Sequence, residues 1–343
     1  MGDLIVATIK DVARLAGVAI STASNALNGN PGIKKETRER IIQTAKSLNY
    51  IPNPIARGLV SRKTRNICTI VSGSKYNSFS NPVYYETIKS FANKLKENKY
   101  LMSLSYITAA DEREYFRHIV ADKSCDAIFM IGPSMKEEEI DAIFCGKLPI
   151  LKFQRKTESK GVYSISFNNF KGAYMATEYL ISMGHKHIGF IGIRPNVSLA
   201  EDRFNGYSQA LSDYGIALDN SIIVEGDYYQ ESGLLGMKEI LRSSKNIPTA
   251  VFAANDVMAL GALEALDQVG LNVPDDISII GHDNIPNLHL LKVPLTTIAV
   301  PFHDMGLLAA NKLLQILAGE DSEMNEVITT VDIRKRKSVK DIN

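Results

Sequence analysis

The chain has 343 residues, of which 45% are hydrophobic, and a formal net charge of +1. This length suits a small domain joined to a larger bilobed unit of a soluble protein. No apolar run reaches the roughly 18 residues that would suggest a membrane span, and the N-terminus lacks a secretory pattern, so we expect a cytoplasmic protein without a membrane partner.

The distribution of charge and the cysteine content further restrict the class of protein. Residues 1–66 hold 11 Lys/Arg against 4 Asp/Glu, whereas the remainder holds 28 against 34. A basic head on an acidic body is expected of a phosphate-binding module on a ligand-sensing core. The three cysteines are widely spaced without a CxxC pair, and Cys68 and Cys125 are predicted to be buried free thiols.

A helix, a tight turn and a second helix are predicted near the N-terminus. Thr8 and Asp11 have the spacing of a capping box at the start of the first helix. Gly17 ends that helix, because glycine tolerates a positive φ, and the second helix begins at Ala19 or Ile20. One side of the second helix consists of two alanines and a leucine. The other side is small, polar and almost uncharged, and carries Ser21, Thr22, Ser24, Asn25 and Asn28.

This polar side favours DNA binding. A short helix with hydrogen-bonding side chains near its N-terminus fits the major groove, where base edges present donors and acceptors. The expected DNA contacts are Thr8, Ile20, Ser21, Thr22, Ser24, Asn25 and Asn28, with Ile20 and Ser21 as base readers. The alternative is a plain helical hairpin whose polar face is only solvated.

A third helix is predicted over residues 35–48, and a turn follows at 49–54. The next segment, 55–61, is too short to be a stable helix alone, and Gly58 weakens it by about 1 kcal/mol. A marginal helix suits a segment that folds only on DNA. The alternative is an ordinary linker with an exposed leucine.

The stretch TIKDVARLAGVAISTASNALNGNPGIKKETRERIIQTAKSLNYIPNPIARGL resembles the DNA-binding head of the LacI-type family of bacterial transcription repressors. The resemblance covers nearly the whole chain, because a core of periplasmic-binding-protein type follows. It implies a homodimer that binds a pseudo-palindromic double-stranded DNA operator. It also implies that 55–61 is a hinge helix in the minor groove, with Leu59 as the wedge and Ala56 and Arg57 as further DNA contacts.

The head departs from the family pattern at two positions. Ala19 stands where a serine usually caps the second helix, so a cap of about 1 kcal/mol is expected to be lost. Asn25 stands where arginine or histidine is frequent. Because asparagine favours adenine through a bidentate contact to N6 and N7, we expect an operator with adenine at the corresponding position.

From Asn66 onward, continuous apolar runs alternate with helical segments, which predicts parallel sheets covered on both faces. Strands are expected at 67–71, 100–106, 125–132, 149–153, 162–167, 187–192, 222–226, 249–254, 277–281, 294–300 and 327–334. Helices are expected at 82–98, 111–122, 136–144, 171–183, 200–214, 229–241, 256–269 and 302–317. The fold class is therefore an all-α helix-turn-helix head plus a bilobed α/β core of two doubly wound parallel sheets.

The domain boundaries follow from this pattern and from the resemblance. The predicted divisions are a DNA-binding domain at 1–53, a hinge at 54–65 and an effector-binding and dimerisation core at 66–343. The family's chain crosses between the lobes three times, which here implies crossings near Phe167, Thr297 and Val327. The N-lobe would then contain about 66–167 and 298–326, and the C-lobe about 168–297 and 327–343.

Ligand-binding candidates lie where strands of the second lobe end. Arg203 could bind vicinal hydroxyls or a carboxylate through its planar fork, and the resemblance implies that it is the main effector contact. Asp283 matches the family's acceptor for sugar hydroxyls, and Asn255 and Asp256 match another pair in the pocket. The alternatives are a helix N-cap for Asp256 and a lobe-bridging ion pair between Arg203 and Asp283.

The first lobe is expected to contribute the other wall of the pocket. The segment between Ser72 and Asn81 is about five residues longer than the family pattern, and its neighbourhood carries the ligand candidates Tyr76, Phe79, Asn81 and Tyr84. Gln154 and Asn168 stand where acidic residues are expected. Fewer carboxylates suggest a ligand that is not strongly basic.

No catalytic motif is present, and we expect neither an enzyme nor a cofactor. The pair His185 and His187 lacks a third ligand nearby in the sequence, so no metal site is expected. The predicted function is a repressor controlled by a small polar, sugar-like effector between the lobes. The alternatives are control by a partner protein or corepressor, a sugar-binding transport receptor, and an enzyme on a doubly wound fold.

Overall fold

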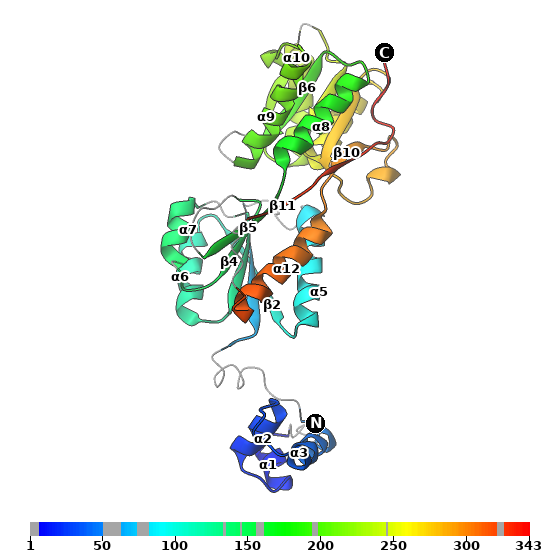
Figure 1. Cartoon of the computed structure of the whole chain (residues 1–343). Coiled ribbons are helices and arrows are strands. Elements are labelled where there is room, and N and C mark those ends of the chain that lie inside the picture. Colours follow the sequence, from blue (N-terminus) through cyan, green and yellow to red (C-terminus); the bar gives the residue numbers. More distant parts are fainter. Residues whose placement is uncertain are drawn as a thin grey trace, which may run out of the picture. The chain divides into compact units, whose positions relative to one another are not determined.

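The computed structural model describes residues 7–50, 63–73, 82–132, 135–144, 146–155, 161–193, 198–244, 246–320 and 326–343. The chain separates into two compact units, Met1–Arg65 and Asn66–Asn343. Figure 1 colours the elements of both units in chain order.

The smaller unit contains α1 (Ile9–Leu15), α2 (Ile20–Leu27) and α3 (Lys35–Ser47). Their shared core is made largely of small side chains, which allows the helices to cross closely. The buried apolar residues are Val12, Ala13, Ala16, Ala23, Ala26, Ile41 and Ala45. The predicted three-helix head therefore forms, and its third helix ends one residue earlier than expected.

The ends of α1 follow the predicted local chemistry. Asp11 accepts a hydrogen bond from the backbone N–H of Thr8 at 3.0 Å and from its hydroxyl at 2.7 Å. These bonds lower the pKa of the Asp11 carboxyl. Gly17 has a φ of +62° and lies just after the helix, as expected for a residue without a Cβ. Both features confirm the sequence interpretation of this segment.

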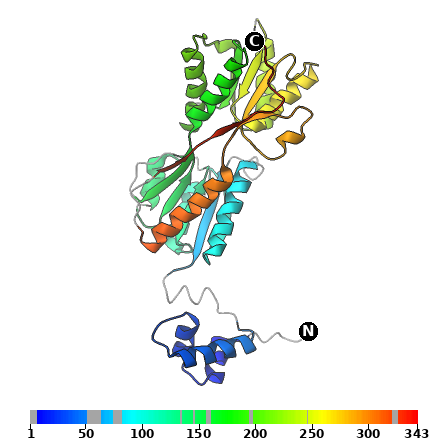
Figure 2. The same cartoon turned by 45° about the vertical axis from the view of Figure 1, so that its right-hand side comes forward.

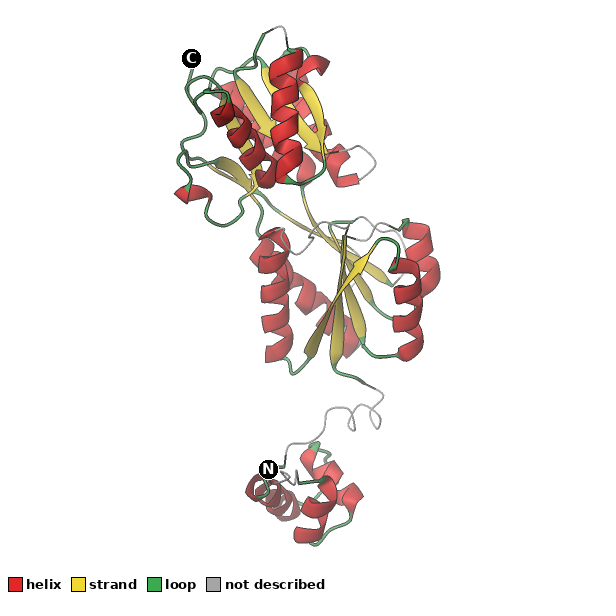
Figure 3. Ribbon diagram, turned by 180° about the vertical axis from the view of Figure 1, so that it is seen from behind, coloured by secondary structure: helices red, strands yellow, loops and turns green. Residues whose placement is uncertain are grey.

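The first sheet of the larger unit has the order β11-β5-β4-β3-β1-β2, and all neighbouring strands are parallel. Its strands are β1 (Asn66–Gly73), β2 (Leu101–Thr108), β3 (Ala127–Ile131), β4 (Ile150–Phe153), β5 (Val162–Phe167) and β11 (Glu326–Thr329). Helices cover both faces (Figure 3). On one face α5 (Pro82–Glu97) packs against α12 (Phe302–Ala318), and on the other α6 (Glu112–Asp122) packs against α7 (Glu137–Phe144).

Strand β1 shows how the sequence produces this double-sided core. Ile67 and Val71 belong to the apolar cluster that includes Phe91 of α5. Cys68 and Ile70 belong to the cluster that includes Phe116 of α6. Alternate side chains point to opposite faces of a strand, so a continuous apolar run fills both layers. The predicted burial of Cys68 and Cys125 as free thiols is confirmed.

The second sheet has the order β12-β10-β9-β8-β6-β7. Its strands are β6 (Ile188–Ile193), β7 (Ile223–Gly226), β8 (Ala250–Ala253), β9 (Ser278–Asp283), β10 (Thr296–Ala299) and β12 (Asp332–Arg334). All neighbouring strands of this sheet are parallel except β12, which runs antiparallel to β10. The helices pack as two pairs, α8 (Asn169–Ser182) with α9 (Ser198–Asp213) and α10 (Gln230–Ser243) with α11 (Asp256–Gln268). Two short 3-10 turns, η2 (Asn220–Ile222) and η3 (Leu288–Leu290), complete the lobe.

The predicted second and third crossings between the lobes were each placed about three residues too early. Ile298 pairs with His282 and with Ile333, so β10 stays in the second sheet to its end. Val327 pairs with Ile165, so β11 still belongs to the first sheet. The segment predicted as one strand at 327–334 is therefore two strands in different sheets, and Figure 2 shows this red segment passing between them.

The two histidines weighed as a metal pair have structural partners. His185 is hydrogen-bonded through Nδ1 to the Thr249 hydroxyl at 2.9 Å and through Nε2 to the Lys340 carbonyl at 3.1 Å. His187 lies 3.3 Å from the Asp219 carboxylate. These contacts join β6 to neighbouring loops and to the C-terminal segment. Separately, none of the helices in the described ranges has the length and apolar composition needed to cross a membrane.

Candidate functional site

The predicted DNA contacts of α2 lie on its accessible side. All of them are exposed or half-buried, namely Ile20, Ser21, Thr22, Ser24, Asn25 and Asn28. Ala23 and Ala26 are buried against the other two helices. Ile20 is 48% exposed, which leaves an apolar side chain in the first turn available for a thymine methyl group.

The start of α2 has no side-chain cap. Ala19 occupies the N-cap position with φ −68° and ψ 152°, and its methyl side chain cannot accept a hydrogen bond from the first turn. The N–H groups of that turn are therefore left to water or to an anion such as a phosphate. The expected loss of the cap is confirmed. At the start of α1, Thr8 is exposed, and its hydroxyl donates a hydrogen bond to the Asp11 carboxylate.

Several predicted site residues lie outside the described part of the chain. They are the hinge residues Ala56, Arg57 and Leu59, and the first-lobe residues Tyr76, Phe79 and Asn81. Their assignment remains a prediction from the sequence.

Arg203 is at the centre of a buried polar cluster in the C-lobe. Only 3% of its surface is exposed. Its Nε donates to Oδ1 of Asn169 at 2.8 Å, an Nη1 hydrogen bond reaches the Ala254 carbonyl, and Nη2 donates to Oδ1 of Asp283 at 3.3 Å. Among the described residues, these acceptors use three of the five N–H donors of the guanidinium. The remaining donors can bind a ligand.

The structure brings Arg203 and Asp283 together, as expected from their places at strand ends. Both belong to the C-lobe, because Arg203 lies on α9, which packs on the second sheet, and Asp283 ends β9, which is a strand of that sheet. The alternative of an ion pair that bridges the lobes is therefore wrong. Asp283 also accepts from His282 Nδ1 at 3.1 Å. Its φ of +117° turns the chain at the end of β9.

Asn255 and Asp256 support the site instead of presenting free groups to a ligand. Asn255 caps α11 by accepting from Met258 N at 2.7 Å and donates to the Tyr228 carbonyl at 3.0 Å. Asp256 is fully buried and accepts from the Thr297 hydroxyl at 2.6 Å and from Ile285 N at 2.9 Å. Burial and the nearby Asp283 raise its pKa well above the ordinary value.

These contacts correct one sequence interpretation. The N-cap of α11 is Asn255 and not Asp256, and Asp256 ties the loop after β9 to β10. In addition, Asn168 caps α8 by accepting from Lys171 N at 2.8 Å, so asparagine keeps the capping function that an aspartate would have there.

Sequence reasoning missed two residues of this cluster. Asn169 accepts from Arg203 and is 2% exposed. It lies two residues after the end of β5, and this place near a strand end was the available signal. Tyr228 follows β7 by two residues, and its pKa is raised by burial and by Asp283. Burial, with Tyr228 and Asp283 adding to its effect, also raises the pKa of the predicted first-lobe residue Tyr84.

An aromatic stack connects the polar cluster with two crossings between the lobes. The Arg203 guanidinium lies 5.6 Å from the ring centre of Phe167, which ends β5. Phe167 stacks on His282 at 5.7 Å and meets Phe302 edge-on at 6.0 Å. Phe302 starts α12, just after the second crossing. A change at Arg203 therefore acts directly on residues at which the lobes are joined.

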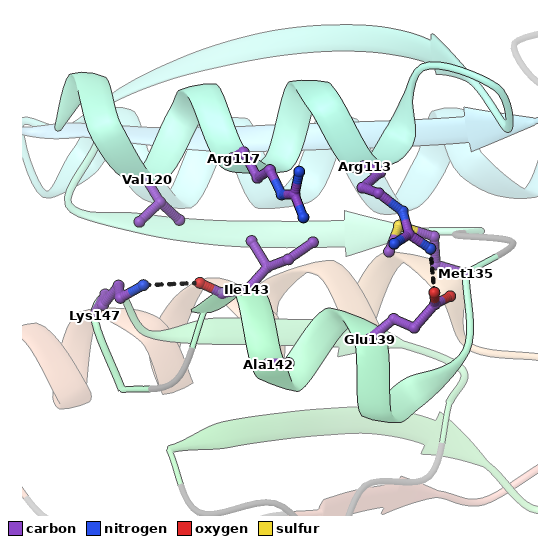
Figure 4. Close-up of a pocket in the computed structure, with 8 residues that line it drawn as sticks. All are labelled: Arg113, Arg117, Val120, Met135, Glu139, Ala142, Ile143 and Lys147. Atoms are coloured by element: carbon purple, nitrogen blue, oxygen red, sulfur yellow. Dashed lines mark hydrogen bonds and ion pairs between the residues drawn. The ribbon is translucent and has the colours of Figure 1, made fainter.

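A separate pocket of about 360 Å³ lies on the N-lobe between α6 and α7 (Figure 4). Its charged lining consists of Arg113, Arg117, Glu139 and Lys147. Arg113 is ion-paired with Glu139, and Lys147 donates to the Ile143 carbonyl at 3.3 Å. None of the predicted effector residues within the described ranges lines this pocket.

Comparisons with known proteins agree with this arrangement. Residues 8–53 match the model for bacterial regulatory proteins of the lacI family, and residues 177–339 match a periplasmic binding protein-like domain. The chain is 33% identical to the ribose operon repressor of Haemophilus influenzae over 336 residues, which cover 97% of this chain and 98% of that one. It is 34% identical to the HTH-type transcriptional repressor PurR of Histophilus somni, with 96% and 98% covered.

A solved structure has a similar fold. The lac repressor dimer bound to operator and the anti-inducer ONPF matches with a TM-score of 0.83 at 25% identity, and 97% of this chain and 99% of that chain are covered. The relatives named are transcriptional repressors and not enzymes. Sequence relatives over nearly the full length, a matching head and a matching core together establish that the chain belongs to the LacI family of bacterial regulatory proteins.

Proposed function

We propose that this protein represses transcription in the cytoplasm as a homodimer that binds a pseudo-palindromic operator and is controlled by a small, polar, sugar-like effector. The observation that carries the effector part is the buried cluster of Arg203, Asn169 and Asp283. The two N–H donors of Arg203 that bind no other described residue lie beside a carboxylate, and this pairing suits adjacent hydroxyl groups of a sugar. Tyr84 and Tyr228 are both sensitive to the charge of Asp283, and we propose that their rings contribute to the same ligand site.

The head supports the DNA-binding part of the proposal. Two heads related by a two-fold axis read two half-sites of an operator, which accounts for a pseudo-palindrome. The side chains of α2 specify the bases, and the positive charge of the head supplies the attraction to phosphates. In the proposed mechanism, the hinge residues Ala56, Arg57 and Leu59 add minor-groove contacts.

Effector control follows from the stack of Arg203, Phe167 and Phe302. A ligand that binds one relative lobe angle better than another shifts the population of the two arrangements. The coupling is expected to have the usual size of about 1–3 kcal/mol. An inducer lowers operator affinity, and a corepressor raises it.

The DNA-binding part is tested by gel retardation of operator fragments with the full chain and with a chain that starts at residue 66. Retardation is expected only with the full chain. DNA binding that survives removal of the head would contradict the assignment of that function to residues 1–65.

The effector part is tested by thermal unfolding in the presence of sugars, sugar phosphates, nucleosides and purine bases. A ligand at 100 times its Kd is expected to stabilise the protein by about 2.7 kcal/mol. Repeating the retardation assay with that ligand separates an inducer from a corepressor. A panel without any stabilising compound would favour control by a partner protein.

A further inference from the structure

The end of α2 brings two asparagines together. Gly29 has a φ of +78°, its N–H donates to the Ala26 carbonyl at 3.2 Å, and the N–H of Asn30 donates to the Asn25 carbonyl at 3.0 Å. These two bonds define a Schellman motif, in which the N–H of the second residue after the C-cap donates to a carbonyl of the last helical turn. The motif usually brings apolar side chains into contact at this place, whereas here it brings two amides together.

The two amides are hydrogen-bonded to one another. Nδ2 of Asn30 donates to Oδ1 of Asn25 at 2.8 Å. The guanidinium of Arg38, in α3, donates to the carbonyl of Asn30 and so fixes the turn to the third helix. Asn30 is therefore held by backbone bonds on one side and by Arg38 on another. Its side chain supports Asn25 on the exposed face of α2.

The direction of this bond determines what Asn25 presents to DNA. An amide oxygen accepts two hydrogen bonds, and the NH₂ group donates two. Asn30 occupies one acceptor direction of Oδ1, and among the described residues nothing else binds the Asn25 amide. Its outer edge therefore offers one acceptor and one donor in a set order. A bidentate contact to adenine depends on this order, since Oδ1 accepts from N6 while Nδ2 donates to N7. If the Asn25 amide alone turned over, its NH₂ would face the NH₂ of Asn30.

We propose that Asn30 is a positioning residue that determines operator specificity: its bond to Asn25 fixes the direction of the Asn25 amide and thereby the base read at one operator position. The inference rests on the proposed function, because it assumes that α2 reads the operator. It assigns a role in base selection to a residue that lies beyond the helix.

The experiment selects operators from a randomised pseudo-palindromic library with the full-length protein and its variants. Asn25→Ala identifies the position, because only there is base preference lost. The unaltered protein is expected to prefer adenine at that position. Asn30→Asp can only accept, so it turns the Asn25 amide over and should reduce the adenine preference roughly tenfold, within the range of one bidentate contact. Asn30→Ala removes the support and should reduce the preference less.

Asn49→Asp is the matched control. Asn49 is exposed, lies just after α3 and has a φ of +49°, which both asparagine and aspartate tolerate. The Asn49→Asp substitution adds the same negative charge to the head at a site that does not contact Asn25. It should therefore weaken binding to all DNA sequences alike. Helix content by circular dichroism should be unchanged in every variant, because the backbone bonds of the turn remain.

The outcomes separate the inference from the proposed function. Selection of no operator by the unaltered protein would contradict the proposed function itself. A selected operator without a preference at the Asn25 position, or with a preference that Asn30→Asp leaves unchanged, would overturn the role of Asn30. A changed preference at this position alone, with the positions read by Ile20 and Ser21 unaffected, would support it.

Discussion

At the scale of single residues, the proposed recognition of the effector depends on the planar fork of Arg203. Arg203→Lys keeps the positive charge but cannot donate to Asn169, Ala254 and Asp283 together. We expect effector affinity to fall at least tenfold, which corresponds to about 1.4 kcal/mol, and measure it by calorimetric titration. Arg242→Lys is the control, because Arg242 forms an exposed ion pair with Glu239. Equal effects of the two substitutions would contradict this role of Arg203.

His282 gives a second prediction at this scale, on pH dependence. Burial, reinforced by the positive charge of Arg203, lowers the pKa of His282 to about 4. Between that value and the ordinary pKa of about 6.5, the unfolded chain binds a proton that the folded chain does not. Neutral His282 therefore contributes roughly 3 kcal/mol to the free energy of unfolding above about pH 6.5. This contribution is lost as the pH falls towards 4.

His282→Gln should remove this part of the pH dependence. Unfolding by urea at pH 7 and at pH 4.5 gives the free energy of unfolding for both proteins, and the difference between the two pH values should be smaller in the variant. His118→Gln, on the exposed surface of α6, should behave like the unaltered protein. An unchanged pH difference in His282→Gln would show that His282 is not the group responsible.

Individual residues also show what the sequence could and could not reveal about the site. Arg203 and Asp283 were identifiable because both lie near strand ends in a doubly wound sheet. The burial of Asp256 was not identifiable, since its partners Thr297 and Ile285 are 41 and 29 residues away in the chain. Asn169 was missed because a polar residue at the start of a helix resembles an ordinary cap. Only the folded chain shows that its amide accepts from Arg203.

At the scale of elements, the missing cap of α2 can be restored. Ala19 already has the extended backbone of an N-cap, so Ala19→Ser should accept a hydrogen bond from the first turn without rearrangement. We expect stabilisation of the head by about 1 kcal/mol. Amide hydrogen exchange of α2 in the full-length protein measures it. Ala19→Val adds bulk without an acceptor and should give no stabilisation, and equal protection in both variants would contradict the capping argument.

The positions of the strands could be predicted more closely than their pairing. Apolar runs located the strands of both sheets to within a few residues, because burial on both faces imposes a strong local pattern. The segment 327–334 was misread as one strand, since nothing local marks the change of sheet between Thr329 and Asp332. Its division is set by pairing with β5 and β10, which lie more than 30 residues away in the chain. Such long-range pairing is outside the reach of local periodicity.

At the scale of the whole molecule, regulation requires that effector binding change how the two lobes are joined. The crossing residue Phe167 contacts Arg203 on one side and Phe302 on another. It is buried and makes no polar contact of its own through its side chain. Its aromatic ring is therefore suited to transmit a displacement of Arg203, whose remaining N–H donors bind the effector in the proposed function.

Phe167→Leu should separate these two roles. Leucine keeps most of the apolar volume but loses the stack with His282 and the contact of the guanidinium with a ring face. Effector affinity should change less than threefold. The ratio of operator Kd values with and without effector should fall towards one, as the coupling of about 1–3 kcal/mol is reduced. Fluorescence anisotropy of a labelled operator measures this ratio.

Phe91→Leu is the control for the loss of an aromatic ring. Phe91 stacks on Phe129 at 4.5 Å within the N-lobe and touches neither Arg203 nor a crossing residue through any ring contact in the described structure. It should reduce stability, as core truncation does, yet leave the effector-dependent ratio intact. If Phe167→Leu preserved the full ratio, or if Phe91→Leu abolished it equally, the path from Arg203 through Phe167 would not be the one that couples the two sites. The coupling would then have to pass through the third crossing, between β11 and β12, or through contacts at the first two crossings that do not involve Phe167.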